Sequence, residues 1–222
     1  MTDWGSVACI TRVYERPDTA FVNSTYGLMQ LGFRPGDVMM PAVMGLPAHT
    51  AMNQAMQAFC DSDELAHCDT LCTIDCDHVF TPDTLERLRT SEAGQEHDAL
   101  GALYVARQRD FPLVLRLGDG KTWDEPLFAV HDDWTRGDVV PVDSMGFGFT
   151  LIRRAAIEAV REANGDDYWC WYPWRDASED VAFFRQVARL GMTAAVHTGV
   201  SIAHVSRSVS VPFDDWQAHR GA

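Results

Sequence analysis

The stretch TLCTIDCDHVFTPDTLERL, residues 70–88, contains the pattern that decides the fold. Residues 70–74 are apolar or β-branched, which predicts a buried strand, and residues 75–78 then bring two aspartates and a histidine. Thr81 and Pro82 follow, and threonine as cap with proline in the first turn is typical of a helix start. A strand that ends in acidic residues and leads into a helix is the building unit of an α/β protein with a parallel sheet.

The same alternation of short apolar runs and helical stretches covers most of the chain. We expect further strands at residues 7–11, 37–43, 99–105, 145–152, 194–197 and 200–204, and helices at residues 21–31, 49–59, 153–163 and 178–190. Pro41 places the second strand near a sheet edge or at its own end. Residues 107–142 are rich in Asp, Gly and Pro, so we expect a loop or hairpin there. Because no repeat or low-complexity linker interrupts the pattern, we predict one α/β domain over residues 1–222, with a mixed, mainly parallel sheet.

Length and charge limit the function. The chain has 222 residues and a formal net charge of −14, from 32 acidic and 18 basic side chains, and Lys121 is its one lysine. The hydrophobic share of 46% suffices for a real core, and 11 Phe, 7 Trp and 5 Tyr exclude a disordered chain. The charge argues against a global cationic surface for nucleic acid or anionic membranes. A chain of this kind that handles phosphates needs a cation from elsewhere.

Targeting signals and a cysteine-based metal site are not expected. The first residues lack a basic segment, and no apolar run reaches the length of a signal peptide or membrane span, so we expect a cytoplasmic protein without a membrane anchor. Cys68, Cys72 and Cys76 recur every fourth residue, a spacing that matches neither a zinc site nor an iron–sulfur run. We expect them to be reduced and packed in or beside a strand.

Asp75 and Asp77 are the first candidate site residues. Side chains at i and i+2 of a strand point to one face, and ligands of open α/β sheets bind outside the carboxyl ends of the strands. Two carboxylates there suit Mg²⁺ or Mn²⁺ bound together with phosphates, although a plain strand-end turn explains the pair equally well. The other such pair, Asp61 and Asp63, follows a polar helix exit, which is typical of a solvated loop.

Two further candidates have a structural and a functional interpretation. Glu179 and Asp180 open a helix after Ser178, where acids are favoured by the helix dipole, but a carboxylate there could also act as a general base. His204 follows an apolar strand and could be an ordinary core or surface residue. As a neutral imidazole it could instead complete a metal site with two carboxylates and bias that site toward Mn²⁺.

Glycines and aromatics add two weaker candidates. Gly146 and Gly148 allow either a strand irregularity or a turn that faces a substrate. Residues 168–174 contain Trp169, Trp171 and Trp174, which could fill a core or stack on a sugar or base.

Taken in order, these segments resemble the GT-A class of nucleotide-sugar glycosyltransferases, in particular the compact, family-two-like members of bacteria and their phages. Residues 70–88 look like the strand, D-x-D and helix block of that class. Residues 142–154 are similar to its D-x-x-G-x-G-x-x-L-x-R-R segment. Residues 178–184, followed by Gly191 and His204, resemble its S-E-D-V-x-F … G … H ending.

The resemblance implies a GT-A fold with a nucleotide-sugar half (residues 1–105) and an acceptor and catalytic half (residues 106–222). It implies a divalent cation, Mn²⁺ or Mg²⁺, held by Asp75, Asp77 and His204. It also implies that Asp180 is the catalytic base and that Glu179 orients the acceptor. The positions implied at the donor are Thr11, Arg12, Glu15, Asn53, Asp75, Cys76, Asp77, Gly146 and Gly148. Met52 stands where these enzymes often carry an arginine beside the asparagine, so a donor contact usually made by that arginine is in question.

The expected function is metal-dependent transfer of a sugar from a nucleoside diphosphate sugar, with a UDP-sugar favoured, to an acceptor hydroxyl. Direct attack by a hydroxyl activated at Asp180 would invert the anomeric centre. A glycan, a protein, a small metabolite or a hydroxylated base of phage DNA could be the acceptor. Two alternatives remain open: a metal-dependent nucleotidyltransferase or phosphoesterase, and an inactive carbohydrate-binding protein. Residues 12–15 do not form the glycine-rich basic loop that the first alternative usually has.

Overall fold

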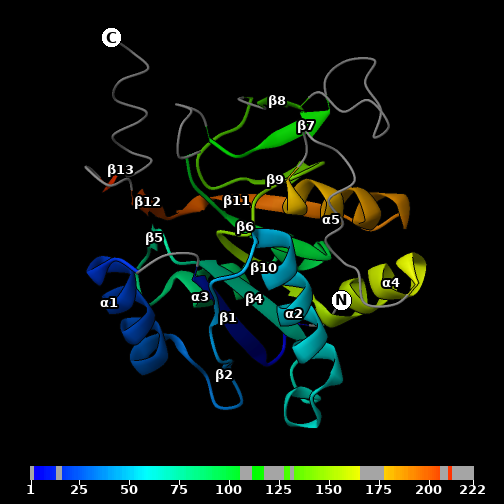
Figure 1. Cartoon of the computed structure of the whole chain (residues 1–222). Coiled ribbons are helices and arrows are strands. Elements are labelled where there is room, and N and C mark those ends of the chain that lie inside the picture. Colours follow the sequence, from blue (N-terminus) through cyan, green and yellow to red (C-terminus); the bar gives the residue numbers. More distant parts are fainter. Residues whose placement is uncertain are drawn as a thin grey trace.

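A central mixed sheet organises the molecule (Figure 1). The computed structural model describes residues 3–13, 17–105, 112–117, 128–130, 133–165, 178–205 and 210–211. Within them, the main sheet has the strand order β2-β1-β4-β10-β6-β11-β9, and β3 also pairs with β1. These strands are β1 (Val7–Val13), β2 (Val38–Met39), β3 (Val43–Met44), β4 (Thr70–Asp75), β6 (Ala99–Leu103), β9 (Val139–Val142), β10 (Phe149–Arg153) and β11 (Ala194–Ser201).

Strand directions confirm the predicted α/β class with a mainly parallel sheet. Strand β1 is parallel to β2, β3 and β4, and β11 is parallel to β6. Strand β10 is antiparallel to both β4 and β6 and lies between them, and β9 is antiparallel to β11. Because β10 runs the opposite way, the residues just before it lie beside the carboxyl ends of β4 and β6.

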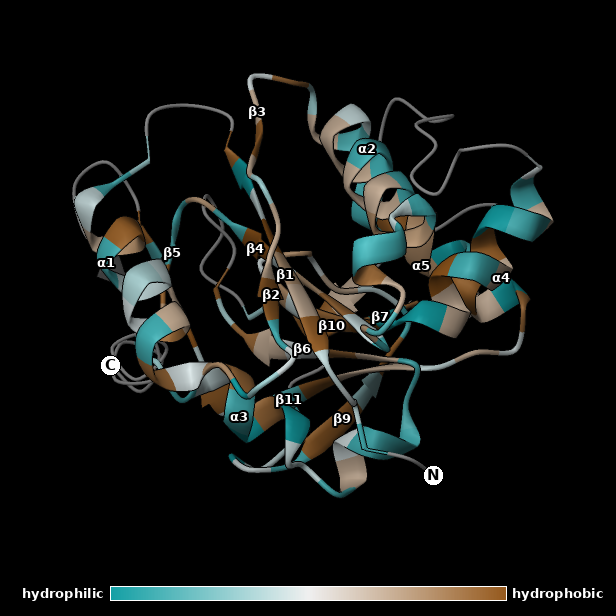
Figure 2. Cartoon of the chain, turned by 90° about the horizontal axis from the view of Figure 1, so that it is seen from below, coloured by the Kyte–Doolittle hydropathy of each residue, from teal (hydrophilic) through white to brown (hydrophobic). Residues whose placement is uncertain are grey.

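Helices cover both faces of this sheet (Figure 2). They are α1 (Thr19–Gly27), which continues into the π-helical turn η1 (Leu28–Gly32), α2 (Ala48–Asp61), α3 (Thr84–Arg89), α4 (Arg154–Asn164) and α5 (Glu179–Arg189), with short 3-10 turns η2 (Asp63–Leu65) and η3 (Ala93–Glu96). Ala8 and Ile10 of β1 pack on the face of α2, α4 and α5, whereas Val7 and Cys9 pack on the face of α1 and α3. A strand that is buried on both faces reads as a continuous apolar run, which is why the central strands were recognisable from sequence.

Two smaller sheets complete the fold. Strands β5 (His78–Val79), β12 (Ala203–Val205) and β13 (Ser210–Val211) form one of them, in the order β13-β12-β5. Strands β7 (Leu115–Leu117) and β8 (Phe128–Val130) form an antiparallel hairpin, which agrees with the hairpin expected between residues 107 and 142. In the part of the chain that the structure describes, no helix has both the length and the hydropathy needed to cross a membrane.

Four elements differ from the sequence-based expectation. The strand expected at residues 145–152 begins at Phe149, in β10. The strand expected at residues 37–43 is two short pieces, β2 and β3, on either side of Pro41, because proline donates no hydrogen bond to a ladder. The helix expected to open at Thr81 begins at Thr84. The Thr81 carbonyl accepts a hydrogen bond from the Thr84 N–H (3.0 Å), which forms a turn before the helix. The strands expected at residues 194–197 and 200–204 are one long strand, β11, followed by β12.

A buried ion pair ties the first strand to α3. Arg89 and Asp37 have 1% and 0% of their side chains exposed, and an Arg89 guanidinium nitrogen lies 2.6 Å from Asp37 Oδ2. The Asp37 carboxylate also accepts the backbone N–H groups of Val7 (2.9 Å) and Arg34 (2.7 Å). This pair joins the amino-terminal ends of β1 and β2 to α3, and removing one partner would leave a buried charge uncompensated.

Candidate active site

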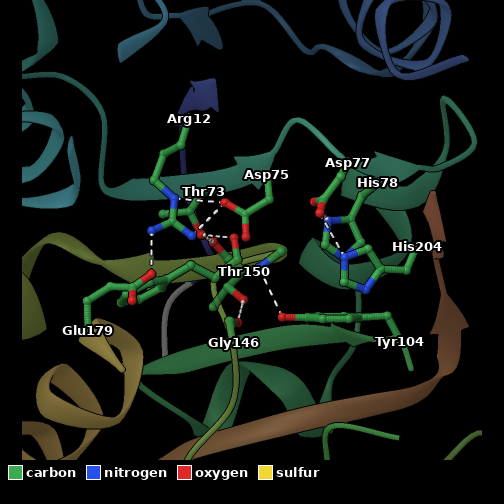
Figure 3. A network of polar contacts seen from close by, with 12 residues as sticks. Arg12, Thr73, Asp75, Asp77, His78, Tyr104, Gly146, Thr150, Glu179 and His204 are labelled. Carbon is green, nitrogen blue, oxygen red and sulfur yellow. Dashed lines mark hydrogen bonds and ion pairs between the residues drawn. The ribbon is translucent and has the colours of Figure 1, made fainter. Parts of the chain in front are cut away.

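Polar side chains converge at the carboxyl ends of three strands (Figure 3). Arg12 lies near the end of β1, Asp75 is the last residue of β4, and Tyr104 directly follows β6. The turn between β4 and β5 supplies Asp77, and α5 supplies Glu179 in its first turn. Ligands of open α/β sheets bind at this edge, so the topology places the candidate residues where a substrate would be expected.

Asp77, His78 and His204 form a compact cluster of metal-ligating groups, and within the described residues no other such cluster of three is found. The small sheet builds it, because β5 and β12 pair with His78 opposite His204. His204 Nε2 lies 2.9 Å from Asp77 Oδ2, and His78 Nδ1 lies 3.2 Å from Asp77 Oδ1. Ligand atoms about 2.1 Å from one ion and at right angles to each other would be about 3 Å apart, so this spacing fits a shared coordination shell.

Hydrogen bonding of His204 supports a cation at this position. Its Nδ1 lies 3.0 Å from the carbonyl oxygen of Val105, which can only accept, so Nδ1 carries a hydrogen. In the neutral ring, Nε2 then directs a lone pair at the carboxylate of Asp77, and only a proton or a metal ion between them makes this contact favourable. A histidine that donates one nitrogen to a carbonyl and keeps the other for a cation is the usual arrangement of a metal ligand.

His78 is held by ring packing rather than by hydrogen bonds. Its side chain is 2% exposed, and neither ring nitrogen has a hydrogen-bond partner among the described residues. The ring stacks on His204 with a centroid distance of 4.4 Å, and the edge of Tyr104 approaches it at 4.5 Å. A buried imidazole without such partners needs an explanation, and an ion beside Asp77 provides one.

The charge of Asp77 is favoured by its neighbours. Burial alone would raise the pKa of Asp77, but its close contacts with His204 and His78, together with the charges of these rings when they are protonated, hold this pKa well below its usual value. The carboxylate is therefore ionised throughout the physiological range and available as a ligand.

Asp75 lies outside this cluster and is bound by Arg12. The Arg12 Nε–H donates to Asp75 Oδ1 at 2.8 Å, and a second guanidinium nitrogen lies 2.5 Å from the same oxygen. The third nitrogen donates to Glu179 Oε1 at 2.9 Å. Arg12 is 2% exposed, and its guanidinium lies over the ring of Phe147 at 5.3 Å. One buried cation thus connects the end of β4 with the start of α5.

The pKa of Asp180 is shifted toward neutrality. Burial and the charge of Glu179 raise the pKa of Asp180 to about 7, against the opposing effects of Ser178, the Val181 N–H and Arg12. Its Oδ1 accepts from the Ser178 hydroxyl and from the Val181 N–H (2.7 Å). A base works best when its pKa lies near the working pH, so a carboxylate that titrates near neutrality suits proton transfer.

Gly146 and Gly148 lie between the metal cluster and Asp180. A Cβ at Gly146 would meet the Tyr104 hydroxyl at 2.0 Å and Asp180 Oδ2 at 3.4 Å. A Cβ at Gly148 would meet His78 Cε1 and Tyr104 Cζ at 2.8 Å. The Gly148 N–H also donates to the Tyr104 hydroxyl at 3.2 Å. The two glycines therefore make room for the rings of Tyr104 and His78, which is a more specific reason for glycine than a strand irregularity.

The other candidate residues are more loosely connected to this site. Thr11 is buried in β1 opposite Ile74, and the side chain of Cys76 packs into the core on the side of α1 and α3. Asn53 is half-buried in α2, and Met52 is fully buried in the core. Glu15 and the aromatic loop at residues 168–174 lie outside the described residues. The competing pair at residues 61 and 63 is at a helix exit, as expected, and Asp61 pairs there with Arg161 at 2.7 Å.

Sequence reasoning did not single out His78 and Tyr104. His78 directly follows Asp77, and neighbours in a strand point to opposite faces, but the turn between β4 and β5 brings both side chains together. Tyr104 lies near the end of the strand expected at residues 99–105, so the rule that sites form at the carboxyl ends of strands was the signal that could have found it.

Comparisons with known proteins identify the fold. No protein-family model and no curated protein sequence matches this chain. Among solved structures, A197 from STIV matches with a TM-score of 0.64 and 14% identity, covering 95% of this chain and 91% of that one. GalNAc-T7, solved with UDP, GalNAc and Mn²⁺, matches with a TM-score of 0.60 and 10% identity, covering 92% of this chain and 44% of that one. The chain therefore has the GT-A type of fold found in glycosyltransferase structures, and it spans less than half of the GalNAc-T7 chain.

Proposed function

We propose that this protein is a metal-dependent glycosyltransferase that uses a nucleoside diphosphate sugar. The observation that carries the proposal is the placement of two different groups on either side of Gly146 and Tyr104. On one side lies a cluster suited to a divalent cation, and on the other lies Asp180, a carboxylate that titrates near neutral pH. The GT-A fold and the UDP and Mn²⁺ in the GalNAc-T7 structure support a UDP-sugar as the donor.

Asp77, His78 and His204 would hold the cation. Two imidazoles and one carboxylate are softer than an all-oxygen site, which favours Mn²⁺ over Mg²⁺. When bound, the cation would act as a Lewis acid on the diphosphate of the donor and stabilise the charge of the leaving group. Asp75 was predicted as a third ligand, but it lies outside the cluster and pairs with Arg12, which supports a place beside the cation.

Asp180 would accept the proton of the acceptor hydroxyl. Its Oδ1 is held by Ser178 and the Val181 N–H, which leaves Oδ2, on the side of Gly146, as the oxygen that takes the proton. The acceptor oxygen would form the new bond to the anomeric carbon, and the bond from that carbon to the diphosphate oxygen would break. Attack opposite to the leaving group inverts the configuration. Strand pairing between the two halves of the chain, β4 with β10, supports one domain for both steps.

The test is donor turnover. Purified protein with Mn²⁺ is incubated with a panel of nucleoside diphosphate sugars, alone and with glycan, peptide, small-metabolite and hydroxylated-base acceptors, and nucleotide release is measured. We expect release of a nucleoside diphosphate with at least one donor, in wild type but not in Asp77→Ala. Release of a nucleoside monophosphate would instead indicate a nucleotidyltransferase or phosphoesterase. Binding without release for every donor and acceptor would favour a carbohydrate-binding protein and contradict the proposal.

A further inference from the structure

Arg12 joins parts of the site that are far apart in the sequence. Its partners Asp75 and Glu179 are 63 and 167 residues away, and they lie at the end of β4 and in the first turn of α5. A guanidinium offers five donors in a rigid planar fork, which suits two carboxylates in different directions better than a flexible ammonium does. Figure 3 shows Arg12 between these two acids, on the side of the site away from Asp77, His78 and His204.

Several carboxylates lie close to the guanidinium of Arg12. Asp75 and Glu179 are 17% and 14% exposed, so their charges are only weakly screened by solvent. Asp180 directly follows Glu179, and its pKa is raised by burial and by the Glu179 charge. A buried cation that pairs with Glu179 reduces this repulsion and lowers the pKa of Asp180.

We propose that Arg12 is a positioning residue that couples the donor side of the site to the catalytic base. By holding Asp75 and Glu179 on one guanidinium, it fixes the first turn of α5 against the sheet and balances the charge beside Asp180. This inference deepens the proposed function and rests on it for the role of Asp180 as the base.

Several groups act on Asp180, and they determine the expected direction of each change. Glu179 and Ser178 belong to the start of the same helix, and Arg12 faces Asp180 from β1. The Tyr104 phenol faces Asp180 from the position after β6. The pKa of Tyr104 is itself raised by burial and by the charges of Asp75 and Asp180. Removing the cation leaves Glu179 unbalanced and raises the pKa of Asp180. Removing the Glu179 charge has the opposite effect. If Arg12 only packed against Phe147, replacing it would leave the pKa of Asp180 unchanged.

The test uses the pH dependence of folding stability, which needs no substrate. Because the pKa of Asp180 is higher in the native than in the unfolded protein, stability falls as pH rises from about 4 and levels off once the pH passes the native pKa. We call the pH at which stability stops falling the levelling point, and we expect it near pH 7 in wild type. It should lie up to about one pH unit higher in Arg12→Met and at a lower pH in Glu179→Gln. Arg12→Lys, which keeps the charge, should remain close to wild type, and the Asp180→Asn variant should lack this component.

Two further readouts separate the inference from the proposed function. Mn²⁺ affinity, measured by calorimetry, should change less than about threefold in Arg12→Met, because the partners Asp75 and Glu179 that Arg12 holds do not belong to the metal cluster. With a productive donor, the pH profile of kcat should shift in the same directions as the stability curves. If Arg12→Met does not fold, Arg12→Gln takes its place, because it also removes the charge but keeps hydrogen-bond donors for Asp75 and Glu179.

The inference is overturned if removing the Arg12 charge lowers stability while the levelling point stays at the wild-type pH. If the stability curves shift as expected but wild type turns over no sugar nucleotide, the coupling stands and the proposed function fails.

Discussion

Replacing Gly148 by alanine tests how tightly the metal cluster is built. The new Cβ would lie 2.8 Å from His78 Cε1, 2.8 Å from Tyr104 Cζ and 2.9 Å from His78 Nε2. Ordinary van der Waals contact begins at 3.4 Å, so the two rings must move by about 0.6 Å. Both rings are buried, and His78 is stacked on His204, so the movement displaces a candidate ligand from Asp77.

The expected magnitudes follow from this displacement. Overpacking of a well-packed site typically costs about 1–3 kcal/mol of folding free energy. A shift of the groups that support a metal site typically lowers metal affinity by about 10- to 100-fold. Urea unfolding of the metal-free protein would measure the first quantity, and calorimetric titration with Mn²⁺ would measure the second.

Gly101→Ala is the matched control. Its Cβ would meet Met145 Sδ at 2.7 Å, but this atom belongs to a flexible side chain that can move away. We expect a smaller loss of stability and unchanged Mn²⁺ affinity, because neither Gly101 nor Met145 belongs to the cluster. Equal Mn²⁺ affinity in Gly148→Ala and wild type would refute the reasoning that His78 is a ligand held in place by this glycine.

Two more variants and the pH profile of the wild type have definite expected outcomes. Asp180→Asn should lower the transfer rate by at least about 100-fold, and a rate near wild type would mean that another group is the base. At pH 8 the same variant should have a higher unfolding temperature, because it lacks a carboxylate whose raised pKa makes the ionised form destabilising. The kcat of wild type should rise with pH to a plateau above about 7, since Asp180 must be deprotonated to act, and a profile that is flat from pH 5 to 9 would contradict this. Asp37→Asn should lower the free energy of unfolding by about 3–5 kcal/mol in urea titrations, since Arg89 would lose its buried partner, and a loss below about 1 kcal/mol would show that the pair is not needed.

Periodicity made most of the fold predictable. The central strands are buried on both faces and lie between clear helical patterns, so their existence and their positions along the chain could be derived from local sequence. Local propensity could not place β9 in the main sheet, because Val139–Val142 lies in a region rich in Asp, Gly and Pro and is recruited by pairing with β11. It also placed the start of α3 too early, because Thr81 forms a turn with Thr84 before the helix begins.

For the site, the sequence motifs predicted some of the residues that lie close together, but not their contacts. Asp77 and His204 were expected together, and they lie 2.9 Å apart although 127 residues separate them. Alternation along a strand predicted that Asp75 and Asp77 share a face, but Asp75 ends β4 and binds Arg12, whereas Asp77 lies in a turn and faces two histidines. Which partner a carboxylate selects depends on tertiary contacts of Arg12, His78 and His204 that no local pattern contains.

Crystallography with Mn²⁺ and a UDP-sugar tests the central claim most directly. The account predicts an anomalous difference peak from Mn²⁺ within about 2.0–2.3 Å of Asp77 Oδ2 and His204 Nε2, with His78 in the same coordination shell and the diphosphate on the opposite side of the ion. A peak at another acidic pair such as Asp61 and Asp63, or a donor bound with no ion at Asp77, would contradict it.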